Sequence, residues 1–132
     1  MFLDTNVIIR HVLADHPDHS PRASSLIARI QAGELRVEIS DTVVFEVVYL
    51  LERTFHVSKA DVRSAVQPLI ELPGIVLTGK YRMLRALEFY TDHNLPIADA
   101  LHAAITETLD PPEIITFDRH FRRVATITSS EP

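Results

Sequence analysis

Cysteine is absent from this chain of 132 residues. The absence excludes disulfide bonds, thiolate zinc sites, iron–sulfur clusters and a cysteine nucleophile. Glycine is scarce, with 3 residues beside 8 prolines, which excludes collagen-like and low-complexity chains. With 46% hydrophobic and 23% charged residues, the composition is that of an ordinary globular protein, and the length suits one domain.

A long hydrophobic run is also missing. The longest apolar stretch, from Val43 to Leu51, contains Glu46 and is far shorter than the roughly 20 residues that cross a bilayer. The first residues lack the basic segment that opens a signal peptide. We therefore expect a cytoplasmic protein without a membrane anchor.

An excess of positive charge is the third absence. The chain has 13 Lys and Arg against 18 Asp and Glu, a formal net charge of −5. Proteins that hold nucleic acid by charge alone are basic, so a nucleic-acid role here would need additional help, which a bound cation could supply. Carboxylates gathered in one place form sites for hard cations, which makes the positions of the acids the main question.

Short apolar segments alternate along the chain with amphipathic ones. The expected strands cover residues 1–3, 35–40, 75–77, 114–116 and 124–127, and the expected helices cover residues 5–13, 22–32, 41–55, 58–72, 80–93 and 96–109. Helices between short strands imply crossover connections and parallel pairing. We predict one domain over residues 1–132, a three-layer α/β/α sandwich around a central, mostly parallel sheet.

Four carboxylates stand out by their surroundings. Asp4 and Asp118 each follow an expected strand, where the site of a parallel sheet lies. Asp99 falls in the first turn of a helix, and Glu46 stands alone among apolar residues of a helix that we expect to be mostly buried. Each aspartate also has a structural interpretation, namely a helix cap for Asp4, a partner of the helix dipole for Asp99 and the start of a turn for Asp118.

Electrostatics limits what four converging carboxylates could do. Two unit charges about 4 Å apart repel by about 4 kcal/mol at an effective dielectric constant of about 20. Three such pairs would cost about 12 kcal/mol, which is comparable with the stability of a whole domain. A cluster of this kind therefore needs protons or a divalent cation, and a site with oxygen ligands and open positions suits phosphodiester hydrolysis.

Four segments in register carry a family resemblance. They are Phe2-Leu3-Asp4-Thr5-Asn6, the lone Glu46, Ile97-Ala98-Asp99-Ala100-Leu101-His102-Ala103-Ala104 and Ile115-Thr116-Phe117-Asp118-Arg119-His120-Phe121. Together they resemble the PIN-domain ribonucleases, and the length and motif order resemble the VapC-type toxins of bacterial toxin–antitoxin pairs. The match spans nearly the whole chain.

The resemblance implies an endoribonuclease dependent on Mg²⁺ or Mn²⁺, usually a homodimer, that a small antitoxin protein inhibits. It assigns Asp4, Asp99 and Asp118 as metal ligands and Glu46 as the fourth catalytic carboxylate, which helps to activate the water. Asn6 and Thr116 match positions that support the pocket by hydrogen bonding. Many relatives have an acid where this chain has His120, a departure that weakens a second metal position.

Other polar groups have more than one interpretation. We interpret the segment from Asp15 to His19 as a solvated loop rather than a metal site, because Pro17 interrupts regular spacing. We interpret His102 as a packed or hydrogen-bonded histidine, with a pocket role as the alternative. The basic residues after Asp118 could hold RNA backbone at the rim of the site or form a solvated face; they are Arg119, Arg122 and Arg123.

The alternative function is non-catalytic. A PIN-like α/β module could keep its acids to bind a metal or a partner without turnover. Metal-dependent cleavage of RNA by the purified protein separates the two hypotheses.

Overall fold

Residues 1–80 form the first of two units in the computed structural model, which describes residues 1–132. Its elements in chain order are α1 (Thr5–Leu13), α2 (His19–Gln31), β1 (Val37–Glu38), α3 (Asp41–Tyr49), the π-helical turn η1 (Leu50–Thr54), α4 (Lys59–Glu71) and β2 (Ile75–Val76). The second unit, residues 81–132, carries nearly all of α5 (Lys80–Asp92), followed by α6 (Ile97–Thr106), β3 (Glu113–Ile115), the 3-10 turn η2 (Arg119–Arg123) and β4 (Thr128–Ser130). The single domain predicted from the sequence stays a prediction.

The strands of the first unit are parallel. Val37 pairs with Ile75 and Glu38 with Val76, while Phe2 makes an isolated parallel bridge to Glu38. Because α3, η1 and α4 lie between β1 and β2 in sequence, the pair is joined by a helical crossover, as parallel strands require. The expected strand at residues 1–3 is thus reduced to one bridge, and its end at Leu3 leads directly into α1.

Short polar side chains cap the starts of α3 and α4, close to the starts expected for the helices over residues 41–55 and 58–72. Ser40 Oγ accepts a hydrogen bond from the backbone N–H of Val43, and Ser58 Oγ accepts one from Asp61. Each such cap satisfies a backbone donor that the first helical turn leaves without a partner. The helix expected from Asp41 to Phe55 is therefore found where predicted, as α3 continued by η1.

Burial of α3 differs from the expectation. Val43, Val44, Val47 and Val48 are buried, whereas Glu46 is exposed. Successive residues of a helix are 100° apart around its axis, so residues four positions apart lie on the same face. Val43 and Val44 therefore share one face of α3 with Val47 and Val48. The prediction of a mostly buried helix is wrong for the opposite face, and Glu46 belongs to that face.

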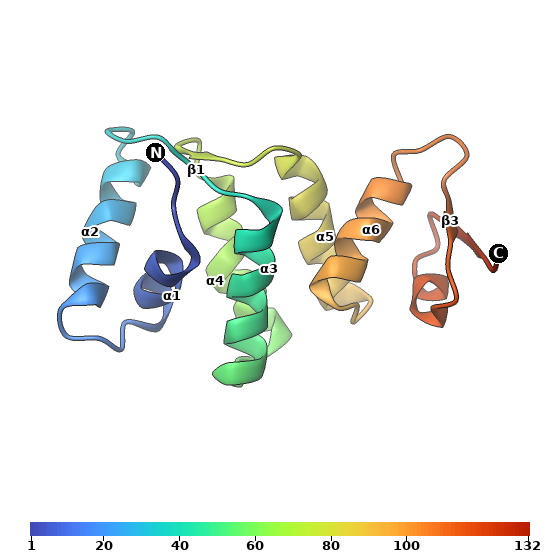
Figure 1. The fold of residues 1–132 in the computed structure, drawn as a ribbon, viewed down its shortest axis with the longest axis horizontal. Coiled ribbons are helices and arrows are strands. Elements are labelled where there is room, and N and C mark those ends of the chain that lie inside the picture. The colour runs from blue at the N-terminus through green and yellow to red at the C-terminus, as the bar shows by residue number, and fades with distance from the viewer. The chain divides into compact units, whose positions relative to one another are not determined.

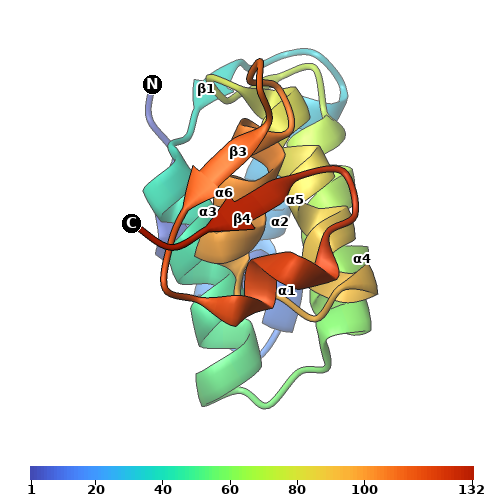
Figure 2. The same ribbon diagram turned by 90° about the vertical axis from the view of Figure 1, so that its right-hand side faces the viewer.

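The second unit has its own parallel pair. β3 and β4 run side by side in Figure 2, with Glu113 opposite Thr128 and Ile115 opposite Ser130. The last strand was expected at residues 124–127 because of its apolar residues, but Val124 is buried just after η2, and the strand begins at Thr128. Pairing with β3, rather than hydrophobicity, selects the strand residues.

Parallel pairing in both units, with helices between the strands, confirms the predicted α/β class with mostly parallel strands. Figure 1 traces the chain from α1 and α2, which lie side by side in the first unit, through to β3 in the second. No helix combines the length and the apolar character that crossing a bilayer requires.

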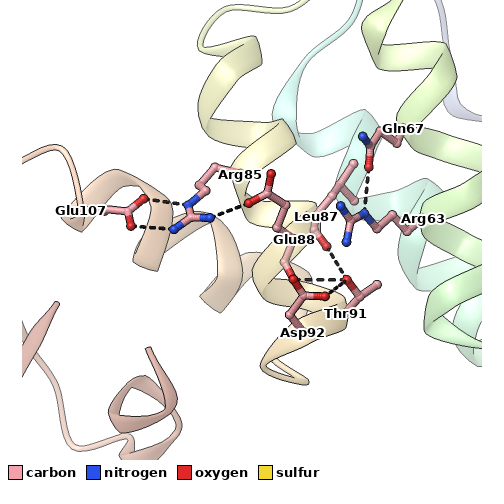
Figure 3. A network of polar contacts seen from close by, with 8 residues as sticks. All are labelled: Arg63, Gln67, Arg85, Leu87, Glu88, Thr91, Asp92 and Glu107. Atoms are coloured by element: carbon pink, nitrogen blue, oxygen red, sulfur yellow. Dashed lines mark hydrogen bonds and ion pairs between the residues drawn. The ribbon is translucent and has the colours of Figure 1, made fainter. Parts of the chain in front are cut away.

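An ion pair joins α5 to the end of α6 within the second unit (Figure 3). Arg85 Nε and Nη2 donate to the two carboxylate oxygens of Glu107 at 2.9 and 2.8 Å, and Arg85 also contacts Glu88. Hydrogen bonding from Arg85 lowers the pKa of Glu107 from 4.5 to about 2. This two-pronged geometry is the strongest form of an arginine–carboxylate pair.

We expect Glu107→Gln to lower the free energy of unfolding at pH 7 by about 1–2 kcal/mol, after allowance for solvent screening of the partly exposed pair. A carboxyl whose pKa is lower in the folded state stabilises the fold fully above its unfolded pKa, here about 4.5. The difference in free energy of unfolding between the wild type and the variant should therefore decrease as the pH falls from about 4.5 towards 2. Urea unfolding at several pH values measures it, with the exposed Glu113→Gln as the charge-matched control. A difference independent of pH would contradict the role of the ion pair.

Candidate metal and nuclease site

The first unit carries two of the four predicted carboxylates. Asp4 occupies the N-cap position of α1, directly after the bridge at Phe2, and its side chain is exposed. Its carboxylate accepts no capping hydrogen bond from the helix. The capping interpretation of Asp4 is therefore wrong for the side chain, which is left without this structural task.

A hydrogen bond joins Glu46 to Thr5, the first residue of α1. The hydroxyl of Thr5 donates to Glu46 Oε2 at 2.6 Å, across 41 positions of sequence. Thr5 is buried, at 5% exposure, so its side chain is fixed, while the carboxylate of Glu46 remains open to solvent. Sequence reasoning missed Thr5, although a hydroxyl next to the strand-end aspartate was the available signal.

Asn6 is exposed on the first turn of α1. It lines a surface cleft of about 580 Å³ between α1 and α2, together with Val7, Arg10, His19, Arg22, Ala23 and Leu26. The supporting role expected for Asn6 stays a prediction.

In the second unit, the structure brings together two predicted carboxylates and one histidine. Three residues each offer one ligand atom, and these atoms lie within 4.8 Å of one another. The residues are Asp99 in the first turn of α6, Asp118 just before η2, and His120 within η2. All three residues are partly buried. Asp99 and Asp118 are 19 positions apart in sequence, so only the packing of η2 near α6 can assemble the group.

Hydrogen bonds fix the segment that carries Asp118. The backbone N–H of Asp118 donates to Thr116 Oγ1 at 3.0 Å, and the N–H of Thr116 donates to the carbonyl of Ser130 on β4 at 2.8 Å. Asp118 Oδ1 in turn accepts from the N–H of His120 at 2.8 Å and caps η2. The turn-forming role considered for Asp118 is thus present, and the same contact holds the carboxylate beside the imidazole.

The imidazole of His120 has one nitrogen without a hydrogen-bond partner. Nδ1 is buried and makes no hydrogen bond, although it lies 3.2 Å from Asp118 Oδ1. A buried polar atom without a partner is uncommon in folded proteins because it loses its hydration without compensation. This atom therefore points to a ligand that binds beside Asp118.

A divalent cation fits this donor set. Two carboxylates within 4.8 Å repel by about 3 kcal/mol at an effective dielectric constant of about 20, and a bound cation turns that repulsion into attraction. Adjacent ligands of an octahedral divalent ion, each about 2.0–2.2 Å from it, lie about 2.8–3.1 Å apart. The separation of 3.2 Å between His120 Nδ1 and Asp118 Oδ1 is close to this range.

Three further histidines lie outside the group of Asp99, Asp118 and His120, namely His16, His19 and His102. His16 Nδ1 accepts from the backbone N–H groups of Asp18 and His19 at 3.3 and 2.9 Å, and its ring stacks on that of His19. The segment thus organises the start of α2, in keeping with the loop interpretation. His102 is exposed, so the packed environment that was one of its two expected structural roles is wrong, while the hydrogen-bonded role stays a prediction.

The three arginines that follow Asp118 are all exposed. Arg123 donates to the backbone carbonyls of His93 and Asn94 at 3.5 and 3.0 Å, so it ties η2 to the segment before α6. Arg119 and Arg122 are exposed, and Arg119 lies between Asp118 and His120 in sequence. Of the predicted rim, these two are the better candidates for contacts to phosphate.

Comparison with known proteins gives one clear result. The family model described as PIN domain matches residues 1–127 of the 132. A search of the curated proteins gives no match. PIN domains are generally metal-dependent nucleases and typically bind a divalent metal, in agreement with the donor set of Asp99, Asp118 and His120. Since the match covers almost the entire sequence, the chain belongs to the PIN-domain family.

Proposed function

We propose that this protein is an endoribonuclease dependent on Mg²⁺ or Mn²⁺, and that it is the toxin of a type II toxin–antitoxin pair. The convergence of Asp99, Asp118 and His120 within 4.8 Å, in a chain of the PIN-domain family, carries the nuclease proposal. The toxin role rests on the length and order of the motifs, which resemble VapC-type toxins. RNA as substrate, a small antitoxin as inhibitor, a homodimer and work in the cytoplasm belong to the same proposal.

Asp99 and Asp118 hold the cation in this proposal, and the motif match assigns Asp4 as a further ligand. A bound divalent ion lowers the pKa of a coordinated water and offsets negative charge on the phosphate. The acids themselves need to be ionised for this task, because only the carboxylate binds a hard cation strongly. Asp4 is exposed and makes no capping bond, so its carboxylate is accessible to a ligand.

Glu46 accepts the proton of the attacking water. The hydroxyl of Thr5 holds one carboxylate oxygen, Oε2, at 2.6 Å, which orients Glu46. As the water loses its proton to Glu46, its oxygen forms a bond to phosphorus, and the bond from phosphorus to the departing oxygen breaks on the opposite side. The departing oxygen keeps the bonding electron pair and takes a proton from solvent. Thr5 is a positioning residue in this scheme, and Arg119 and Arg122 bind neighbouring phosphates of the RNA.

Removal of divalent ions tests the proposal directly. Purified protein should cleave single-stranded RNA with added Mg²⁺ or Mn²⁺, lose the activity by at least about 10³-fold in EDTA, and regain it when excess metal is restored. Gel analysis of end-labelled RNA measures the rate and shows whether cleavage is internal. The same protein repurified after EDTA treatment controls for loss of fold. Cleavage that persists in EDTA would contradict a metal-dependent nuclease, and absence of cleavage with every metal would favour the binding module.

A further inference from the structure

We infer that His120 is a ligand of the bound cation and shifts the preference of the site from Mg²⁺ towards Mn²⁺. The inference rests on the proposed function, since it concerns the same cation. It goes beyond that proposal because it assigns the third donor to a nitrogen rather than to another carboxylate. The observation that carries it is the convergence of the imidazole with Asp99 and Asp118.

The geometry favours coordination over a simple ion pair. In a hydrogen-bonded pair, Nδ1 would donate to Asp118 Oδ1, but the 3.2 Å approach does not form a hydrogen bond and leaves Nδ1 buried without a partner. Oδ1 already accepts from the backbone N–H of His120 at 2.8 Å. The backbone bond thus fixes the carboxylate and the ring on one short turn, with their donor atoms separated as two adjacent ligands of one ion would be.

The chemistry of the donor decides the preference. Mg²⁺ takes oxygen ligands almost exclusively and releases its waters reluctantly, whereas Mn²⁺, which also binds oxygen ligands well, accepts an imidazole nitrogen more readily than Mg²⁺ does. Two carboxylates still provide the charge that attracts Mg²⁺, so both ions should bind. The nitrogen adds affinity mainly for Mn²⁺, and its removal should change the ratio of the two affinities rather than abolish binding.

The surroundings of His120 permit a clean substitution. Its side chain is 45% exposed, so truncation leaves no large cavity in the core. His102 supplies a matched control, because it is an exposed histidine three residues after Asp99 and is not part of the three-residue group. His120→Asp replaces the nitrogen donor by a carboxylate and serves as a second variant.

The experiment measures metal binding without RNA. Mn²⁺ binding is followed by the paramagnetic resonance of the free ion, and Mg²⁺ binding by calorimetry. We expect His120→Ala to weaken Mn²⁺ binding by at least about 10-fold while the affinity for Mg²⁺ changes by less than about 3-fold. His102→Ala should bind both ions like the wild type, and His120→Asp should lower the ratio of Mn²⁺ to Mg²⁺ affinity by about 10-fold.

A spectroscopic signature tests coordination itself. Spin-echo modulation of bound Mn²⁺ by a directly coordinated ¹⁴N should be present in the wild type and in His102→Ala and absent from His120→Ala. Mn²⁺ that binds the wild type without nitrogen modulation, or binds His120→Ala with unchanged affinity, would overturn the inference and leave the proposed function intact. A wild-type protein that binds neither ion would overturn both.

Discussion

Replacing Asp99 by asparagine is expected to reduce cleavage of RNA by about 10³-fold or more, equivalent to about 4 kcal/mol of transition-state stabilisation. The substitution keeps the shape of the side chain and removes the charge that binds the cation. It also relieves the repulsion between Asp99 and Asp118 in the metal-free protein. The variant should therefore unfold, without metal, at the same temperature as the wild type or a higher one.

Thermal unfolding with and without Mn²⁺ separates this effect from a loss of fold. The wild type should gain stability on addition of the metal, because a ligand that binds only the native state raises its free energy of unfolding, and Asp99→Asn should gain much less. Asp61→Asn is the matched control, since Asp61 also lies at the third position of a helix, in α4. Both substitutions weaken an interaction with the helix dipole, but only one removes a ligand. Equal loss of activity in the two variants would contradict the assignment of Asp99.

Replacing Asp4 by asparagine should have a similar effect on cleavage, a loss of about 10³-fold, as expected for the metal ligand that the motif match assigns. Asparagine is as good an N-cap residue as aspartate, and the side chain of Asp4 makes no capping bond. The stability of α1 should therefore be unchanged. Gel assays of cleavage and circular dichroism of the variant measure the two expectations.

Asp18 provides the control for Asp4. It occupies the N-cap of α2, is exposed and makes no capping bond either, so Asp18→Asn changes the same chemical group at the start of another helix. Its ion pair with Arg22, at 3.3 Å, is exposed and contributes little. Full activity of Asp4→Asn in a folded protein would exclude Asp4 from metal binding and catalysis.

Local signals predicted most of the elements because their causes are local. Ser40 and Ser58 cap the helices that follow them. The alternation of short apolar segments with amphipathic ones predicts the parallel pairing of the strands. The errors occur where packing overrides the local pattern. Val124 to Ile127 has the composition of a strand, but the pairing partner of β3 begins at Thr128.

The sequence by itself determined which acids deserve attention, because a lone carboxylate at the end of a strand or in an apolar helix is visible in a short window of residues. It did not determine their surroundings. The exposure of Glu46, its bond to Thr5 across 41 positions and the unpartnered nitrogen of His120 beside Asp118 were decided by tertiary structure. The physical reason is that helix and strand preferences act over a few residues, whereas contacts between distant residues depend on how complete elements pack against one another.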